Sequence, residues 1–174
     1  MSIPNLLTLI RLLLIPWFAI LIINGSLNQA LWVFLAAALT DGLDGFAARL
    51  LAQKTSLGAY LDPIADKLLL STAYIALAVL QQVPVWLAVI VISRDVIIVL
   101  GIIVLFLNEY QVEIRPTIYS KITTVLQILV VFMALSSGYI AYAEWVRWGI
   151  IYLTLVLTVF SGLHYIISGL KILA

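Results

Sequence analysis

The chain has 174 residues, of which 65% are hydrophobic and 10% are charged, with a net charge of +1 and no cysteine. Soluble domains carry roughly a quarter charged residues, so this composition excludes an ordinary water-soluble fold. The absence of cysteine excludes disulfides, thiol catalysis and thiolate metal sites. A nearly neutral chain also gives no sign of a nucleic-acid surface. The composition therefore predicts a protein whose solvent is largely lipid.

Polar breaks divide the chain into apolar stretches of membrane-spanning length. A transmembrane helix needs roughly 20 mainly apolar residues. The breaks are rich in Asn, Gly, Ser, Gln and Pro, and they leave predicted helices near residues 6–23, 29–51, 59–80, 84–107, 117–137 and 145–170. We therefore expect an all-α integral membrane protein with six transmembrane helices, organised as a single domain over residues 1–174. A short interfacial segment is expected before Asn5.

Basic residues near the ends of the predicted helices indicate the orientation in the membrane. Most of them fall on one side of a six-helix arrangement, namely Arg11, Arg49, Lys54, Arg115, Lys121 and Lys171. The turns on the other side carry only Arg147. Because cytoplasmic loops are enriched in Lys and Arg, we expect the basic side and both termini to be cytoplasmic.

Four aspartates lie inside or next to predicted membrane helices, within 26 residues of one another: Asp41, Asp44, Asp62 and Asp66. Each pair, spaced by three or four residues, shares one helix face. The short connection between the pairs predicts antiparallel neighbouring helices whose carboxylates face each other. Such carboxylates relieve their repulsion by staying protonated or by binding cations. Oxygen-only ligands favour Mg²⁺ or Mn²⁺, and two such ions suit phosphoryl chemistry.

Spacing alone leaves three interpretations of these carboxylates open. They form a metal-dependent catalytic site, a proton or cation pathway in a transporter, or a structural cluster with Arg49 and Lys67 as partners. Small residues accompany them, including Gly42, Gly45, Ala47, Ala48, Gly58 and Ala59. Small residues let a ligand's phosphates approach the backbone, but ordinary packing of membrane helices explains any one of them equally well.

The segment from Asp41 to Asp66 reads DGLDGFAARLLAQKTSLGAYLDPIAD. It matches the pattern D-x2-D-G-x2-A-R-x8-G-x3-D-x3-D, which is the signature of the CDP-alcohol phosphatidyltransferase family. The start, IPNLLTLIRLLLIP, resembles the opening of bacterial phosphatidylglycerophosphate and cardiolipin synthases in this family. A cation transporter has no need of the intervening G-x2-A-R-x8-G pattern, so the resemblance favours the enzyme.

The resemblance implies transfer of a phosphatidyl group from CDP-diacylglycerol to an alcohol acceptor, with release of CMP and two divalent cations, Mg²⁺ or Mn²⁺, as cofactors. It implies that Asp41 and Asp62 contact both metals and that Asp44 completes the first site. Asp66 would help hold the second metal and act as the catalytic base on the acceptor hydroxyl. The implied CDP-lipid-binding residues are Gly45, Ala48, Arg49, Thr55 and Gly58.

The same resemblance implies a homodimer in the membrane, with lipids as its partners and no nucleic acid. It also implies the bacterial inner (cell) membrane as the location and an active site that faces the cytoplasm. The asymmetry of the basic residues agrees with that orientation.

A second group of cations lies outside the signature: Arg94, Arg115 and Lys121. A phosphate on the acceptor would bind such side chains. The structural alternative is that Arg94 pairs with Asp95, while the other two mark the membrane boundary. The segments VISRDVIIVLG and RPTIYSKITTVLQ resemble those of CMP-forming cardiolipin synthases. Phosphatidylglycerophosphate synthases more often have Arg-Glu and Gly-Lys there, so Asp95 and Ser120 depart from their pattern.

We therefore expect phosphatidylglycerol as the acceptor, with glycerol 3-phosphate as the alternative. Near the amino terminus, Asn5, Thr8 and Arg11 resemble the family's N-x2-T-x2-R element. That element has either a substrate role or the role of an interfacial anchor. His164, the sole histidine, is expected to bond a neighbouring helix rather than to act in catalysis.

Overall fold

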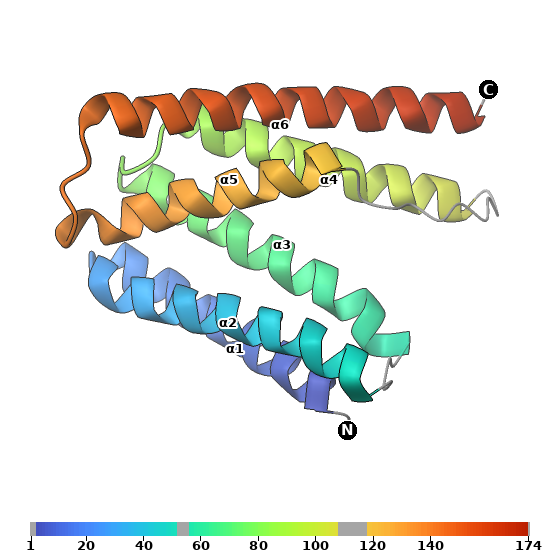
Figure 1. Ribbon diagram of the computed structural model, residues 1–174, viewed down its shortest axis with the longest axis horizontal. Helices are drawn as coiled ribbons and strands as arrows, with labels where there is room; N and C mark the ends of the chain where they lie inside the picture. Colours follow the sequence, from blue (N-terminus) through green and yellow to red (C-terminus); the bar gives the residue numbers. More distant parts are fainter. Residues whose placement is uncertain (1–2, 52–55, 108–117, 174) are drawn as a thin grey trace.

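The computed structural model describes the backbone of residues 3–51, 56–107 and 118–173, and the side chains of residues 9–40, 67–101 and 118–169. The described backbone forms helices and turns and contains no strand. The helices are α1 (Ile3–Ile23), α2 (Leu27–Leu51), α3 (Ser56–Val79), α4 (Val85–Leu107), α5 (Ile118–Leu135), the short 3-10 helix η1 (Ser136–Gly138) and α6 (Glu144–Leu173) (Figure 1).

Over the described backbone, the prediction of an all-α fold with six long helices is confirmed. The observed ends differ from the predicted ends by three residues at most. One detail differs, because α1 already begins at Ile3 and no separate segment precedes Asn5 among the described residues. Pro4 explains this difference, since proline is well tolerated in the first turn of a helix, where its missing N–H needs no partner.

The outer face of the bundle is apolar. Large hydrophobic side chains such as Trp145, Ile118 and Val79 are mostly exposed. Within the described residues, the stretches 118–138 and 144–169 are long and apolar enough to cross a membrane, and shorter apolar stretches occur at 9–23, 27–40 and 67–79. Because helices satisfy their own backbone hydrogen bonds, this surface is consistent with a membrane protein. The number of helices that cross the membrane stays a prediction.

The helices form two groups of three. In the first group, α1 packs against both α2 and α3, and in the second, α6 packs against both α4 and α5. Contacts of α3 with α4 and α5, and of α2 with α5 and η1, join the groups. Figure 1 shows α1 and α2 along one side, α4 and α6 along the other, and α3 and α5 between them. The core includes Phe18 and Phe34, whose rings stack at 6.0 Å between α1 and α2.

Two of the helices, α1 and α3, end in the same capping motif. After α1, Gly25 has a φ of 72°, the N–H of Gly25 bonds the carbonyl of Ile22, and the N–H of Ser26 bonds that of Leu21. After α3, Gln81 has a φ of 57° and the same pair of bonds follows. These Schellman motifs satisfy the last carbonyls of each helix and reverse the chain sharply. Successive helices therefore run in opposite directions, as in an up-and-down bundle.

This up-and-down order separates the two ends of the bundle. The turns after α1, α3 and η1 lie at one end, on the left in Figure 1. Both chain termini, the C-terminal end of α2 and the N-terminal end of α3 lie at the other. The parts of α2 and α3 that carry the signature therefore lie at the end of the bundle that the sequence analysis predicted to be the basic side.

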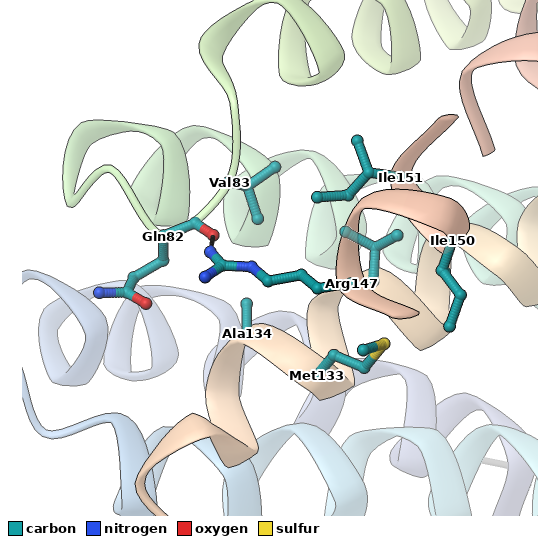
Figure 2. A pocket seen from close by; sticks show the side chains of 8 residues that line it. Gln82, Val83, Met133, Ala134, Arg147, Ile150 and Ile151 are labelled. Carbon is teal, nitrogen blue, oxygen red and sulfur yellow. Dashed lines mark hydrogen bonds between the residues drawn. The ribbon is translucent and has the colours of Figure 1, made fainter. Parts of the chain in front are cut away.

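At the end opposite the signature, Arg147 fastens the start of α6 to the turn between α3 and α4. Its guanidinium donates a hydrogen bond to the backbone carbonyl of Gln82, above a small recess whose other lining residues include Val83, Ala134 and Ile151 (Figure 2). The ring of Trp86 on α4 stacks on that of Tyr152 on α6, and the ring of Trp148 meets Tyr152 at a tilt. Tryptophan and tyrosine at the end of a helical bundle are typical of a membrane interface.

Candidate active site

The signature residues lie on two consecutive helices. Near its C-terminal end, α2 carries Asp41, Asp44, Gly45, Ala48 and Arg49, and the first half of α3 carries Gly58, Asp62 and Asp66. Continuous helix through each aspartate pair confirms that its two members share one helix face. The side chains of all these residues, and Thr55 and Arg115 entirely, lie outside the described residues. Their predicted roles therefore stay predictions.

The next residue after the signature, Lys67, enters a described cluster of charged side chains. Asp95 Oδ1 accepts hydrogen bonds from Lys67 Nζ at 2.7 Å and from Arg94 Nη1 at 2.6 Å. The side chains of Arg94 and Asp95 are only 5% and 8% exposed. Because Lys67 directly follows Asp66, this ion pair fastens the signature part of α3 to the middle of α4.

The guanidinium of Arg94 extends this cluster to α5 and α6. Its Nη2 donates to the Ser120 hydroxyl at 2.6 Å and to the Ser161 hydroxyl at 3.0 Å. A Cβ added at Gly162 would lie 3.4 Å from Arg94 Cγ, so this glycine lets the arginine stem pass close to α6. Arg94 Nε is buried and has no hydrogen-bond partner among the described residues. We call these contacting residues, Lys67, Arg94, Asp95, Ser120 and Ser161, the arginine cluster.

These contacts bear on the predicted acceptor residues. The structural alternative for Arg94 is confirmed in that it pairs with Asp95, and both of its Nη atoms bond protein groups. An acceptor phosphate would therefore reach Arg94 through Nε or in exchange for a serine hydroxyl. Lys121 is exposed in the first turn of α5, directly after Ser120. An acceptor role for either cation stays a prediction.

Two members of the arginine cluster were missed from the sequence. Lys67 was considered only as a partner of the four aspartates, whereas it bonds Asp95. Ser161 was not singled out, although a serine beside a glycine in an apolar helix is a signal for close helix contact. Arg11 is 1% exposed, which favours an internal role over that of an anchor accessible at the membrane surface.

A second polar layer joins the same helices closer to the opposite end. The Tyr74 hydroxyl on α3 donates to the carbonyl of Gln127 on α5 at 3.1 Å. Gln127 Nε2 in turn donates to the Thr158 hydroxyl on α6 at 3.3 Å. Thr123 also donates to the carbonyl of Leu157 at 3.2 Å. These bonds hold α3, α5 and α6 in register below the arginine cluster.

His164 lies at the edge of this region. Its ring meets the ring of Tyr119 edge-on, with centroids 6.3 Å apart. That contact joins α6 to α5, as the prediction of a structural histidine requires, although the described contact is aromatic rather than a hydrogen bond.

Comparison with known proteins identifies the fold's family. A family model described as CDP-alcohol phosphatidyltransferase matches residues 1–160. The chain belongs to the CDP-alcohol phosphatidyltransferase family. This finding confirms the resemblance to this family, and it removes the cation transporter from consideration.

Curated relatives of this chain carry the names of two different enzymes. The chain is 36% identical to the CMP-forming cardiolipin synthase of Rattus norvegicus over 94% of its length. It is 37% identical to the CDP-diacylglycerol–glycerol-3-phosphate 3-phosphatidyltransferase of Pseudomonas fluorescens over 95%. A probable phosphatidylglycerophosphate synthase of Mycobacterium tuberculosis is 31% identical over 98%. Such similar identities leave the acceptor open between the two branches.

The relatives also differ in length from this chain. The chain spans 61% of the rat cardiolipin synthase, 89% of the Pseudomonas enzyme and 82% of the mycobacterial protein. The region held in common therefore includes nearly all of this chain but only part of the rat enzyme.

The predicted metal site is judged from its donor set. Where side chains are described, no group of three or more His, Cys, Asp or Glu residues occurs. The four signature aspartates lie outside that part. A set of four carboxylates, with neither thiolate nor imidazole, fits a hard divalent cation such as Mg²⁺ or Mn²⁺.

Proposed function

We propose that this protein transfers the phosphatidyl group of CDP-diacylglycerol to phosphatidylglycerol, forming cardiolipin and releasing CMP. The observation that carries the reaction is the complete family signature, which runs without a gap from the C-terminal part of α2 to the first half of α3. The match to the family over residues 1–160 supports the same reaction class.

The choice of phosphatidylglycerol rests on the arginine cluster. Asp95 and Ser120 are the positions at which the sequence resembles cardiolipin synthases rather than phosphatidylglycerophosphate synthases. Both contact one guanidinium, that of Arg94, at 2.6 Å. Two residues that bond the same buried cation determine its position together. We therefore treat Asp95 and Ser120 as parts of one site that recognises the acceptor. Relatives named cardiolipin synthase in rat and human, at 36% and 35% identity, support this choice.

Glycerol 3-phosphate is the second candidate acceptor. The Pseudomonas relative, named for that acceptor, is 37% identical to this chain and is of similar length. Both acceptors present a glycerol hydroxyl and a phosphate, so the same cations would serve either. A direct comparison of the two acceptors on the same protein is therefore needed.

We further propose that Asp41, Asp44, Asp62 and Asp66 hold two divalent cations, Mg²⁺ or Mn²⁺. When bound, such ions neutralise charge on the diphosphate of the CDP-lipid. Asp66 accepts the proton of the acceptor hydroxyl, whose oxygen then forms a bond to the phosphatidyl phosphorus. The bond from that phosphorus to the oxygen shared with CMP breaks, and CMP leaves with both bonding electrons. Gly45, Ala48 and Gly58 leave room for the CDP-lipid beside Arg49 and Thr55.

The proposed setting is the bacterial inner membrane, which all six long helices cross. The signature end of the bundle faces the cytoplasm, where CDP-lipid headgroups are accessible and where the basic side is expected. A homodimer is proposed as the assembly, on the family resemblance alone.

The test is CMP release by the purified protein in detergent, with CDP-diacylglycerol and either Mg²⁺ or Mn²⁺. Phosphatidylglycerol, glycerol 3-phosphate and inositol phosphate are offered in separate reactions. We expect release with phosphatidylglycerol and none after chelation of the metal. CMP release with glycerol 3-phosphate alone would identify the protein as a phosphatidylglycerophosphate synthase. No CMP release with any of the three acceptors, from folded protein, would contradict the proposed reaction.

A further inference from the structure

The charges of the arginine cluster do not balance. Lys67 and Arg94 are both cations, and both bond one oxygen of a single carboxylate, Asp95. The described cluster therefore has one positive charge more than it has negative charges. A surplus charge that is largely shielded from water is costly unless an ion of opposite charge lies beside it, because desolvation costs several kcal/mol per ion. An anion is therefore expected next to this cluster.

The four signature aspartates are the first candidates for that anion. Under the proposed function, however, they hold two divalent cations, whose charge equals that of the four carboxylates. The signature then has no net negative charge to offer Lys67. The remaining source of negative charge at this site is the substrate, whose recognisable anionic group is a phosphate.

Lys67 is the member of the cluster that such a phosphate can reach. Its side chain is 31% exposed, whereas the side chains of Arg94 and Asp95 are 5% and 8% exposed. A lysine ammonium has three donors, and the described contact with Asp95 uses one of them. The direct neighbour of Lys67 in the chain is Asp66, the proposed base, so both residues lie at the same depth in the bundle.

Arg94 and Asp95 have a different part in this arrangement. The Asp95 carboxylate bonds Lys67 Nζ at 2.7 Å, and Arg94, which is bonded to Ser120 and Ser161, keeps that carboxylate in place. A lysine side chain has many rotamers, and a buried ion pair at its tip restricts them before a ligand arrives. Asp95 is thus a positioning residue for Lys67.

We propose that Lys67 binds a phosphate group of a substrate, and that Asp95 holds its ammonium in position. This inference rests on the proposed function for the balance of charge at the signature. The phosphate belongs either to the diphosphate of CDP-diacylglycerol or to the phosphate of the acceptor, and the experiment distinguishes these sources.

The experiment compares wild type with Lys67→Met, which removes the ammonium and keeps a chain of similar length. Asp95 keeps its bond to Arg94 in this variant, so no buried charge loses its last partner. Apparent KM values are measured by CMP release, varying CDP-diacylglycerol at saturating acceptor and then the reverse. Loss of one charge-assisted contact should raise KM for one substrate about 10- to 100-fold and leave the other within about 2-fold. Lys67→Arg should recover most of the loss.

Two controls separate this site from general damage and from the proposed acceptor. Arg147→Met removes a cation at the opposite end of the bundle and should change neither KM. Binding of CDP-diacylglycerol and of phosphatidylglycerol is measured separately, as the rise of Tm with ligand concentration, which needs no turnover. If the proposed acceptor is wrong, the wild-type protein will release no CMP with phosphatidylglycerol. A smaller rise of Tm with one ligand in Lys67→Met than in wild type would still support the phosphate site at Lys67.

Three results would overturn the inference. They are unchanged KM values and Tm responses in Lys67→Met, an equal loss for both substrates, and a fall in kcat with neither KM affected. Should Lys67→Met fail to fold, the comparison is made with Lys67→Gln, which also lacks the charge and retains a hydrogen-bond donor. The same three results in that variant would reject the site.

Discussion

The carboxylate of Asp95 is the shared ion-pair partner of two neighbouring cations, Lys67 and Arg94. Its Oδ1 lies 2.7 Å from Lys67 Nζ and 2.6 Å from Arg94 Nη1. Asp95→Asn removes the negative charge and leaves Arg94 buried beside another cation. Breaking a buried pair in this way costs about 3–5 kcal/mol. We expect a markedly lower Tm in detergent, measured by circular dichroism, together with a higher KM for the substrate that Lys67 binds.

A matched control for Asp95→Asn is Ser120→Ala. This change removes one neutral partner of Arg94, whose Nη2 keeps its bond to Ser161. The expected loss of stability is about 1.5–3 kcal/mol, the usual net value of a hydrogen bond to a charged group. A similar Tm for the two variants would show that the charge of Asp95 contributes nothing special.

The signature aspartates give a second prediction for single residues. Asp66→Asn removes the proposed proton acceptor but keeps a side chain of the same size. We expect it to retain CDP-diacylglycerol binding and to lose CMP release by about 10²–10⁴-fold, the usual contribution of a general base. Asp41→Asn should instead weaken activation by Mn²⁺. Unchanged turnover in the first variant, or an unchanged Mn²⁺ titration in the second, would contradict the assigned roles.

Single residues were predictable from the sequence only where a pattern has fixed spacing. The four aspartates stood out because charge is rare in apolar helices. The contacts of Lys67 and Ser161 were not predictable, because their partners come from helices distant in the chain, 28 residues away for Lys67 and 67 for Ser161. No local periodicity carries information about such pairs.

Between elements, the second polar layer holds α5 against α3 and α6. Thr158→Val removes the partner that Gln127 Nε2 bonds at 3.3 Å and leaves the shape of the side chain almost unchanged. Hydrogen bonds between membrane helices contribute about 0.6 kcal/mol on average and up to about 1.7. We therefore expect a fall in Tm much smaller than that of Asp95→Asn.

A double-mutant cycle of Gln127→Ala and Thr158→Val in detergent measures this coupling directly. Additive effects of the two changes would mean that the bond between them contributes no stability. A coupling larger than that of the ion pair would mean that the second polar layer stabilises the bundle more than the arginine cluster does.

The helices themselves were predictable because turn residues interrupt long apolar stretches. Gly25 and the Gln81–Pro84 turn mark two of the helix ends, and both coincide with Schellman motifs. The packing of the helices was less predictable. A nearly uniform apolar sequence faces lipid and neighbouring helices alike, so hydrophobic periodicity does not distinguish the buried face.

For the whole molecule, the prediction concerns orientation. The chain has no cysteine, so a single introduced cysteine reports the accessibility of one site without background. Asn28 is exposed near the turn after α1, and Ile118 is exposed at the opposite end of the bundle. With a membrane-impermeant maleimide on intact cells, we expect Asn28→Cys to be labelled and Ile118→Cys to require permeabilisation. The reverse pattern would place the signature end outside the cytoplasm.

The division of the helices into two groups of three also has a consequence for how the chain can be assembled. The turn from Leu80 to Pro84 is the covalent connection between α1–α3 and α4–α6, and Arg147 on α6 binds the carbonyl of Gln82 within it. Membrane helices insert first and associate afterwards, so a peptide bond in such a turn is not needed for their association. Two co-expressed polypeptides, residues 1–81 and 82–174, should therefore find each other in the bilayer and restore activity by fragment complementation.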